Sequence, residues 1–137
     1  MIYVDTSLVI SYMDLRDPNH DKAVKLIEAF RGERYVVSML VLVELASVYS
    51  RAMFEKPLEL ALYSLEKVGA ELVKLDFDDA VKQAFKLASI LRLRTLDLLH
   101  ISACKSLGAD KLITFDHDVL KKAETIAKTV GLKIVGV

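Results

Sequence analysis

Apolar residues along the chain follow two spacings, which predict two kinds of element. Short runs rich in Val, Ile and Leu, bounded by turn residues, are typical of buried strands. They occur at residues 2–4, 35–37, 71–75, 111–114 and 132–135. Between them, apolar residues recur every three or four positions, as on one face of a helix. The predicted helices span residues 20–31, 39–54, 58–68, 78–92, 96–107 and 117–130.

Strands that alternate with helices favour a parallel sheet covered on both faces. The sequence therefore predicts an α/β fold, a three-layer α/β/α sandwich with a five-stranded parallel sheet, formed by residues 1–137 as one domain. Four glycines support the helix boundaries, because each follows a helical segment where a left-handed residue ends the helix cheaply. They are Gly32, Gly69, Gly108 and Gly131.

The helix at residues 78–92 has the clearest apolar face, and we expect that face to be buried. It consists of Val81, Ala84, Phe85, Ala88 and Leu91. Segment 45–65 is also unusually apolar and aromatic, with Tyr49, Met53, Phe54 and Tyr63. It could serve as a groove for a partner helix, as a dimer face or as part of the core.

Composition excludes several classes of protein. With 53% apolar and 28% charged residues, the 137-residue chain is globular rather than disordered. It has no run of 18 apolar residues and no recognisable secretory signal, so we expect no membrane partner. One cysteine, Cys104, excludes an intramolecular disulfide, fits a reducing cytoplasmic compartment and is expected to be a buried apolar residue. A net charge of zero excludes a strongly basic nucleic-acid coat but not a local basic patch.

Four acidic residues are candidates for a catalytic or metal-binding site. Asp5 directly follows a predicted strand, Asp116 lies two residues after another, and Asp97 falls in the first turn of a predicted helix. Each could simply cap a helix or favour its dipole. Glu44 is the one charge in an apolar helical stretch, where an ionised carboxylate is costly unless it is paired or bound to a metal. A buried pair with an Arg or Lys is the alternative for Glu44.

Together the four acids indicate a metal site. In a parallel sheet, strand ends meet at one edge, and that edge is where ligands bind. Carboxylates gathered there repel one another unless a cation is present. An oxygen-only set suits Mg²⁺, with Mn²⁺ as a substitute, and such a site suggests phosphate chemistry. The histidines and the single cysteine have no zinc-site spacing.

In this order, the acids and their neighbours resemble the PIN-domain family of ribonucleases, and most closely its VapC-type toxins. The resemblance rests on Val-Asp-Thr-Ser at residues 4–7, Glu44, Asp-Leu-Leu-His at residues 97–100, and Ile-Thr-Phe-Asp at residues 113–116. It implies a metal-dependent endoribonuclease, in which Asp5, Glu44, Asp97 and Asp116 are catalytic and bind the metal. A metal-activated water would cleave the RNA phosphodiester bond. Asp118 is a second candidate for the fourth acid.

The resemblance also implies partners. VapC-type relatives are inhibited by a cognate VapB-like antitoxin, and homodimers are usual. Small hydroxyl residues border the family's site, and Thr6 and Thr114 match them. These threonines are possible substrate contacts, together with Arg92 and Arg94, which precede Asp97 and could hold phosphates or solvate a helix end. His100 is a further candidate, either for substrate contact or for a hydrogen bond within the fold.

Other functions remain open on the sequence alone. The chain could be a PIN-domain RNA-processing nuclease without an antitoxin, or a catalytically inactive PIN-like binding module. A phosphoacceptor receiver domain has a similar sheet, but it needs an acidic pair after the first strand. Asp5 is followed instead by Thr6 and Ser7, which disfavours that class.

Overall fold

A computed structural model of the chain describes residues 1–136. Its centre is a sheet of five parallel strands in the order β3-β2-β1-β4-β5. The strands are β1 (Ile2–Val4), β2 (Tyr35–Val37), β3 (Ala70–Leu72), β4 (Lys111–Ile113) and β5 (Lys133–Val135). The parallel α/β fold predicted from the sequence is confirmed.

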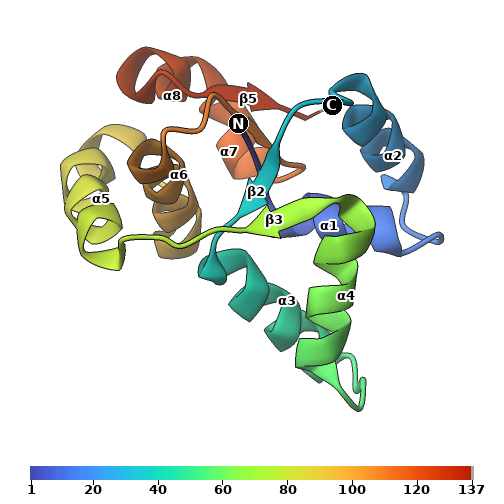
Figure 1. The fold of residues 1–137 in the computed structure, drawn as a ribbon. Helices are drawn as coiled ribbons and strands as arrows, with labels where there is room; N and C mark the ends of the chain where they lie inside the picture. Colours follow the sequence, from blue (N-terminus) through green and yellow to red (C-terminus); the bar gives the residue numbers. More distant parts are fainter. Residues whose placement is uncertain (137) are drawn as a thin grey trace.

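Helices cover the sheet on both faces (Figure 1). They are α1 (Thr6–Met13), α2 (His20–Ala29), α3 (Met39–Arg51), α4 (Pro57–Val68), α5 (Phe77–Leu91), α6 (Thr95–Leu107), α7 (His117–Lys121) and α8 (Ala123–Val130). Figure 1 shows α1–α4 toward the right and bottom of the sheet and α5–α8 toward the left and top. None of these helices, within residues 1–136, is long and apolar enough to cross a membrane.

The three central strands, β2, β1 and β4, lie at the centre of the hydrophobic core. Every residue of β1 is fully buried, and so are Val36, Val37 and Ile113 on the two neighbouring strands. Strands covered on both faces have no polar side to present, which is why they appear in the sequence as unbroken apolar runs. Cys104 is also fully buried, as expected for a small apolar residue.

The order of the strands reverses direction beside β1. The chain moves from β1 to β2 to β3 toward one side, then returns to β4 and β5 on the other. Crossovers therefore lead away from the gap between β1 and β4, and this leaves the carboxyl ends of these two strands accessible. Asp5 follows one of these strands, and Asp116 lies three residues beyond the other.

Four predicted elements differ clearly from the structure. The strand predicted at residues 71–75 is β3, at Ala70–Leu72, an edge strand whose Leu72 is 39% exposed. The helix predicted at residues 117–130 is two helices, because Lys122 (φ −99°, ψ 9°) leaves the helical conformation between α7 and α8. The helices predicted to end at residues 31 and 54 stop at Ala29 and Arg51.

The buried face predicted for α5 is wrong. Val81 and Phe85 are 39% and 79% exposed, and Ala88 is exposed too. The buried residues are Ala80, Ala84, Leu87 and Leu91. The two stripes share Ala84 and Leu91 and differ by one position elsewhere. Small alanines on the true face let α5 approach its neighbour α6 closely, and periodicity alone does not weigh this.

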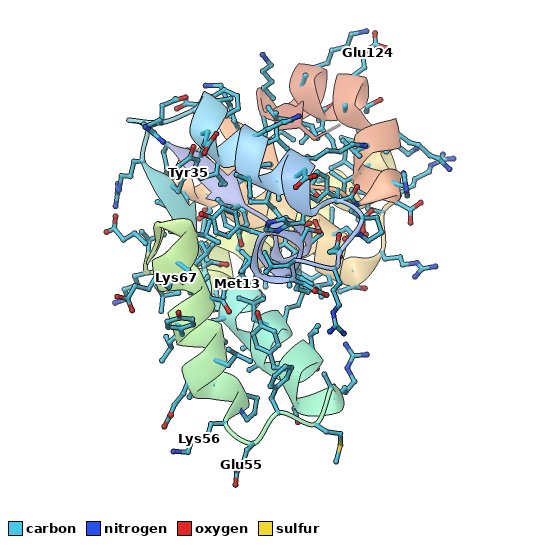
Figure 2. The ribbon with its side chains drawn as sticks, turned by 90° about the vertical axis from the view of Figure 1, so that its right-hand side faces the viewer. Met13, Tyr35, Glu55, Lys56, Lys67 and Glu124 are labelled. Carbon is cyan, nitrogen blue, oxygen red and sulfur yellow. The ribbon has the colours of Figure 1, made fainter. Side chains whose placement is uncertain are left out.

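Helices α3 and α4 form an arm that extends away from the sheet. Figure 2 shows the turn with Glu55 and Lys56 at the tip of this arm. The two helices are joined inside the arm by a hydrogen bond of 2.7 Å between Tyr49 Oη and Ser64 Oγ. The segment that the sequence left open between groove, dimer face and core is thus divided. Tyr49 is buried, whereas Met53 and Tyr63 are 87% and 48% exposed.

Candidate metal centre

The fold brings the four acids to one edge of the sheet. β1 and β4 pair in register, with Val4 opposite Ile113, and the Asp5 N–H donates to the Ile113 carbonyl oxygen at 3.0 Å. Asp5 therefore stands beside the segment that leads to Asp116. Glu44 enters from α3 and Asp97 from the first turn of α6. The predicted gathering of acids at this strand end is what the topology produces.

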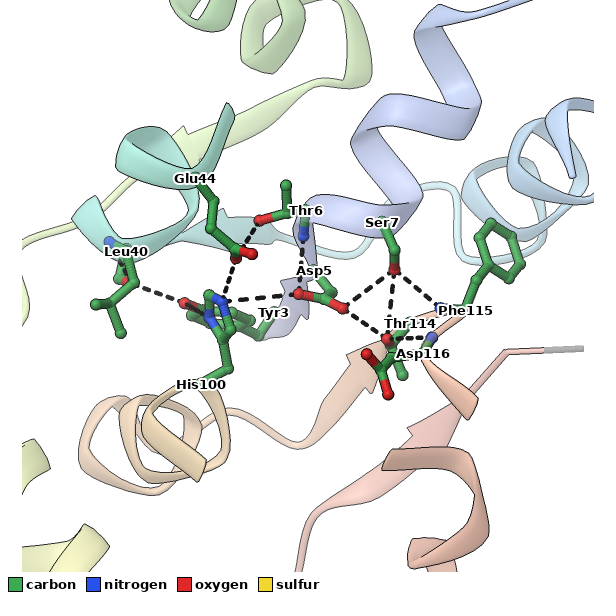
Figure 3. Close-up of polar contacts among 11 residues, drawn as sticks. Tyr3, Asp5, Thr6, Ser7, Leu40, Glu44, His100, Thr114, Phe115 and Asp116 are labelled. Carbon is green, nitrogen blue, oxygen red and sulfur yellow. Dashed lines mark hydrogen bonds and ion pairs between the residues drawn. The ribbon is translucent and has the colours of Figure 1, made fainter. Parts of the chain in front are cut away.

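Asp5 is held by three hydrogen bonds. Its Oδ1 accepts from the Thr6 N–H at 2.9 Å, which caps α1. Its Oδ2 accepts from Thr114 Oγ1 at 2.6 Å and from Ser7 Oγ at 3.1 Å (Figure 3). Donors on both oxygens leave this nearly buried carboxylate a single orientation. The capping role foreseen for Asp5 and its place in the acidic site are thus compatible.

Glu44 is half-buried, and its partner is a histidine. Its Oε1 accepts from Thr6 Oγ1 at 2.7 Å and lies 2.6 Å from His100 Nε2. Burial raises the pKa of Glu44, but the hydrogen bonds from His100 and Thr6 outweigh burial, so the pKa lies below its ordinary value. The Arg or Lys partner that the sequence left open for Glu44 is absent from the described residues.

His100 is 4% exposed on the inner side of α6. Its Nε2 is also 3.8 Å from Asp5 Oδ1. Burial lowers the pKa of His100, but the bond to Glu44 and the charges of Asp5 and Glu44 raise it above its ordinary value overall. Asp5, Glu44 and His100 offer ligand atoms within 4.8 Å of one another and are called the His100 cluster below.

Asp97, Asp116 and Asp118 form a second group, the Asp97 cluster, whose carboxylate oxygens also come within 4.8 Å of one another. Asp116 caps α7, since its Oδ1 accepts from the N–H groups of Asp118 and Val119 at 2.9 and 3.2 Å. The Asp97 carboxylate accepts no hydrogen bond within residues 1–136. Burial, then the charges of Asp116 and Asp5, raises the pKa of Asp97 to about 6.

These donors fit a hard divalent cation. Both bonds to Glu44 end on Oε1, so among the described residues its Oε2 has no hydrogen-bond partner. The same holds for Asp116 Oδ2. These two free oxygens are available to a cation, and an oxygen-ligated cation would relieve the repulsion that raises the pKa of Asp97.

The candidates for substrate contact fall into two groups. Thr6 and Thr114 are 4% and 0% exposed, and their hydroxyls donate to Glu44 and Asp5. With His100, these two buried threonines form hydrogen bonds to the acids. Arg92 and Arg94, in contrast, are exposed and line a hollow of about 250 Å³.

That hollow adjoins the acids and collects basic side chains. Its lining consists of Arg92, Leu93, Arg94, Asp118, Lys121 and Lys122. Because Asp118 belongs to both the hollow and the Asp97 cluster, the basic side chains stand next to the acidic edge.

Three polar residues of the site were missed in the sequence. Tyr3 and Ser38 bond to each other at 2.7 Å behind His100, and Ser7 Oγ accepts from the Phe115 N–H at 3.0 Å. Of the three, only Ser7 could have been predicted from the sequence as part of the site, because it lies two residues after Asp5. A tyrosine in an apolar strand and a serine before a helix are common, and their meeting depends on the pairing of β1 with β2.

Comparison with known proteins adds a family. A model of the PIN domain matches residues 2–125. VapC20 from Mycobacterium tuberculosis, a "Sarcin-Ricin loop cleaving toxin", is 20% identical with a TM-score of 0.69, over 88% of this chain and 94% of that chain. A chain of VapBC2 from Rickettsia felis, in a complex bound to a promoter DNA fragment, is 18% identical with a TM-score of 0.66, covering 100% and 99%.

A third similar structure is VapBC-1 from nontypeable Haemophilus influenzae, at 22% identity and a TM-score of 0.64, over 99% of this chain and 98% of that chain. No curated protein sequence matches the chain. At these identities the similarity to solved structures is one of fold, and it covers at least 88% of each chain compared.

Proposed function

The chain belongs to the PIN-domain family, and from this premise we propose that it is a metal-dependent endoribonuclease, the toxin component of a VapBC-type pair. One observation carries the proposal. Asp5, Glu44, Asp97 and Asp116 come from four elements and lie in the two clusters at the strand end where the sheet reverses its order, close enough that the charges of Asp116, Asp5 and Glu44 act on Asp97. Capping and packing alone would not require such a concentration of negative charge.

The residues that would hold the cation are Asp5, Glu44, Asp97 and Asp116. Their oxygen ligands suit Mg²⁺, with Mn²⁺ as a substitute. When bound, such a metal supplies an activated water and neutralises charge on the phosphate. The chain's own part is to hold Asp5 and Glu44 in place through Thr6, Thr114 and His100.

Binding of RNA would use the hollow beside the acids. Arg92, Arg94, Lys121 and Lys122 line it, and none of the four forms an ion pair within residues 1–136. Unpaired cations next to a carboxylate-rich edge can hold the phosphates that flank a scissile bond. We propose this hollow as the backbone contact, and the cytoplasm as the place of action.

An antitoxin would have an apolar groove available. A hollow of about 390 Å³ between α1, α3 and the start of α4 has a mainly apolar lining, consisting of Ile10, Met13, Asp14, Val48, Tyr49, Ala52, Phe54 and Leu60. Similar structures include complexes titled VapBC, which supports a VapB-like partner here. We also propose a homodimer, for which the exposed apolar residues of α5 offer one surface.

Cleavage of RNA tests the proposal directly. Purified chain would be incubated with a panel of RNAs in Mg²⁺, in Mn²⁺ and in EDTA, beside Asp97→Asn and Asp78→Asn. Asp78 is a matched control, because it is also an aspartate in the first turn of a helix but belongs to neither acidic cluster. We expect metal-dependent cleavage that Asp97→Asn loses by a factor of about 10²–10³ and Asp78→Asn retains.

The same assay separates the other functions. Cleavage that survives in Asp97→Asn would overturn the assignment of the site. A folded chain that binds Mn²⁺ but cleaves no RNA in the panel would favour an inactive binding module. Active cleavage that no co-expressed small protein inhibits would favour an RNA-processing nuclease.

A further inference from the structure

A closed chain of hydrogen bonds runs behind Glu44. His100 Nδ1 lies 3.1 Å from Tyr3 Oη, which lies 2.7 Å from Ser38 Oγ. Ser38 Oγ accepts from the Leu40 N–H at 3.2 Å and so caps α3, the helix that carries Glu44. The chain therefore begins and ends on α3, and it passes through β1 and α6 between these points (Figure 3).

The direction of the bond to Glu44 follows from its charge. An ionised carboxylate only accepts hydrogen bonds, so His100 Nε2 carries a proton and donates it to Oε1. At 2.6 Å this is a hydrogen-bond distance. With Nε2 engaged in this way and Nδ1 facing Tyr3, neither ring nitrogen has a lone pair directed at the acidic edge.

Both donors to Glu44 use the same oxygen. Thr6 Oγ1 and His100 Nε2 bond to Oε1, and Oε2 has no hydrogen-bond partner in the part of the chain described here. A glutamate has three rotatable side-chain bonds, and holding it in one arrangement costs conformational entropy. Two donors on one oxygen fix the carboxylate and leave the other oxygen for a ligand.

We propose that His100, braced by Tyr3 and Ser38, is a positioning residue that holds Glu44 so that Oε2 is presented to the cation. This inference rests on the proposed function, because it assumes that Glu44 binds a divalent metal. It assigns a role to three residues, one at the capped end of α3, that are not metal ligands themselves. Groups that orient ligands through a second hydrogen bond typically change metal affinity 10- to 100-fold when they are removed.

Binding of Mn²⁺ alone tests the role without RNA. Titration followed by electron paramagnetic resonance gives the affinity of wild type, His100→Leu, His100→Gln and Tyr3→Phe. The amide N–H of glutamine can occupy the place of Nε2, so His100→Gln restores the donor that His100→Leu removes. We expect His100→Leu to bind Mn²⁺ about 10- to 100-fold more weakly, His100→Gln to recover most of the affinity, and Tyr3→Phe to lose several-fold.

Tyr49→Phe is the matched control. It removes a buried tyrosine–serine bond of the same 2.7 Å length as the one between Tyr3 and Ser38. It lies in the α3–α4 arm, so a general loss of packing would affect both variants, and only Tyr3→Phe would weaken Mn²⁺ binding. If His100→Leu does not fold, the comparison of Tyr3→Phe with Tyr49→Phe still decides.

Three results would overturn the proposal: wild-type affinity in His100→Leu, equal losses in Tyr3→Phe and Tyr49→Phe, or a nitrogen coupling in the spectrum that shows imidazole bound directly to Mn²⁺. Each is compatible with metal-dependent cleavage by the wild type, so the proposed function would stand. A wild type that binds no Mn²⁺ and cleaves no RNA would overturn both.

Discussion

The two halves of the acidic edge differ in how their negative charge is compensated. In the His100 cluster, Asp5 and Glu44 accept hydrogen bonds from main-chain and side-chain donors, and the pKa of Glu44 is lowered. In the Asp97 cluster, Asp97 has no donor within residues 1–136, and burial together with the charges of Asp116 and Asp5 raises its pKa to about 6. The fold itself compensates the charge of one half and leaves the repulsion at Asp97 uncompensated.

The two clusters therefore contribute to the stability of the folded protein with opposite signs. Charged groups that receive good hydrogen bonds contribute to folding, whereas like charges held together oppose it. A site made only of hydrogen-bonded carboxylates would be rigid, but a bound metal would add little to its stability. A site made only of carboxylates that repel one another would be poorly ordered without a metal. Measurements of stability can therefore test the comparison.

The largest expected effect is stabilisation by the metal. A ligand that binds only the folded state at 100 times its dissociation constant adds about 2.7 kcal/mol to the free energy of unfolding. We expect Mn²⁺ to raise the stability of the wild type by this order in urea denaturation. In Asp97→Asn the gain should be much smaller, because the repulsion that the cation relieves is already reduced.

The matched control is again Asp78→Asn, which should gain as much from Mn²⁺ as the wild type. An equal gain in Asp97→Asn would show that the Asp97 cluster is not where the cation acts. No gain in any variant would count against a metal site altogether.

Replacing Asp5 tests the other half. Asp5→Asn keeps one acceptor oxygen but substitutes an amide where Thr114 and Ser7, or Thr6, donate. Hydrogen bonds to charged groups contribute about 1.5–3 kcal/mol each, so we expect the metal-free protein to lose roughly 2 kcal/mol of stability in urea denaturation.

Asp76→Asn is the control for this change. Asp76 also caps a helix, since it accepts from the Asp79 N–H at 3.1 Å, but it has no further partner within the described residues. Asparagine is about as good a cap as aspartate, so its stability should stay close to that of the wild type. Equal losses in the two variants would mean that Asp5 acts only as a cap.

We expect Asp97→Asn to stabilise the metal-free protein, whereas Asp5→Asn destabilises it. The native state keeps the Asp97 proton up to about pH 6, whereas the unfolded chain releases it near pH 3.8. Between these values the native state binds more protons, so the free energy of unfolding falls as pH rises through the window. The shift would cost about 3 kcal/mol at full strength, and solvent screening at this partly buried carboxylate reduces that to about 1 kcal/mol.

We therefore expect metal-free Asp97→Asn to be about 1 kcal/mol more stable than the wild type at pH 7.5. The difference between the two proteins should vanish near pH 3.5. Urea denaturation at a series of pH values measures this difference directly. A variant that is less stable than the wild type at neutral pH would contradict the idea that Asp97 is held at a cost.

Much of the fold and of the acidic edge follows from the sequence. Buried strands are short apolar runs, and acids at or just beyond the ends of such strands meet once the sheet is parallel, so the proximity of Asp5 and Asp116 could be predicted without a structure. Glu44 could be found because no other charge shares its apolar stretch. These inferences depend on local pattern and on one rule of topology.

What failed depends on contacts between elements. The buried face predicted for α5 differs by one position from the observed face. Both faces contain Ala84 and Leu91, and only the packing against α6 decides between them. The partner of Glu44 was sought among Arg and Lys, because nothing local connects a residue of α3 with His100 56 positions later. Tyr3 and Ser38 carry no signal until β1 and β2 are paired.

The smallest expected effect decides which aspartate is the fourth acid. Asp116 is partly buried and its charge raises the pKa of Asp97, whereas Asp118 is exposed. Charges that face solvent are strongly screened, so we expect Asp118→Asn to change the rate of RNA cleavage by less than about 3-fold. Asp116→Asn keeps the cap of α7, because asparagine offers the same acceptor, but removes the charge beside Asp97. Its rate should fall about 10- to 100-fold. If Asp118→Asn is the more damaging change, the fourth acid is Asp118, two residues further along the chain, and the hollow that Asp118 lines becomes part of the metal site rather than its neighbour.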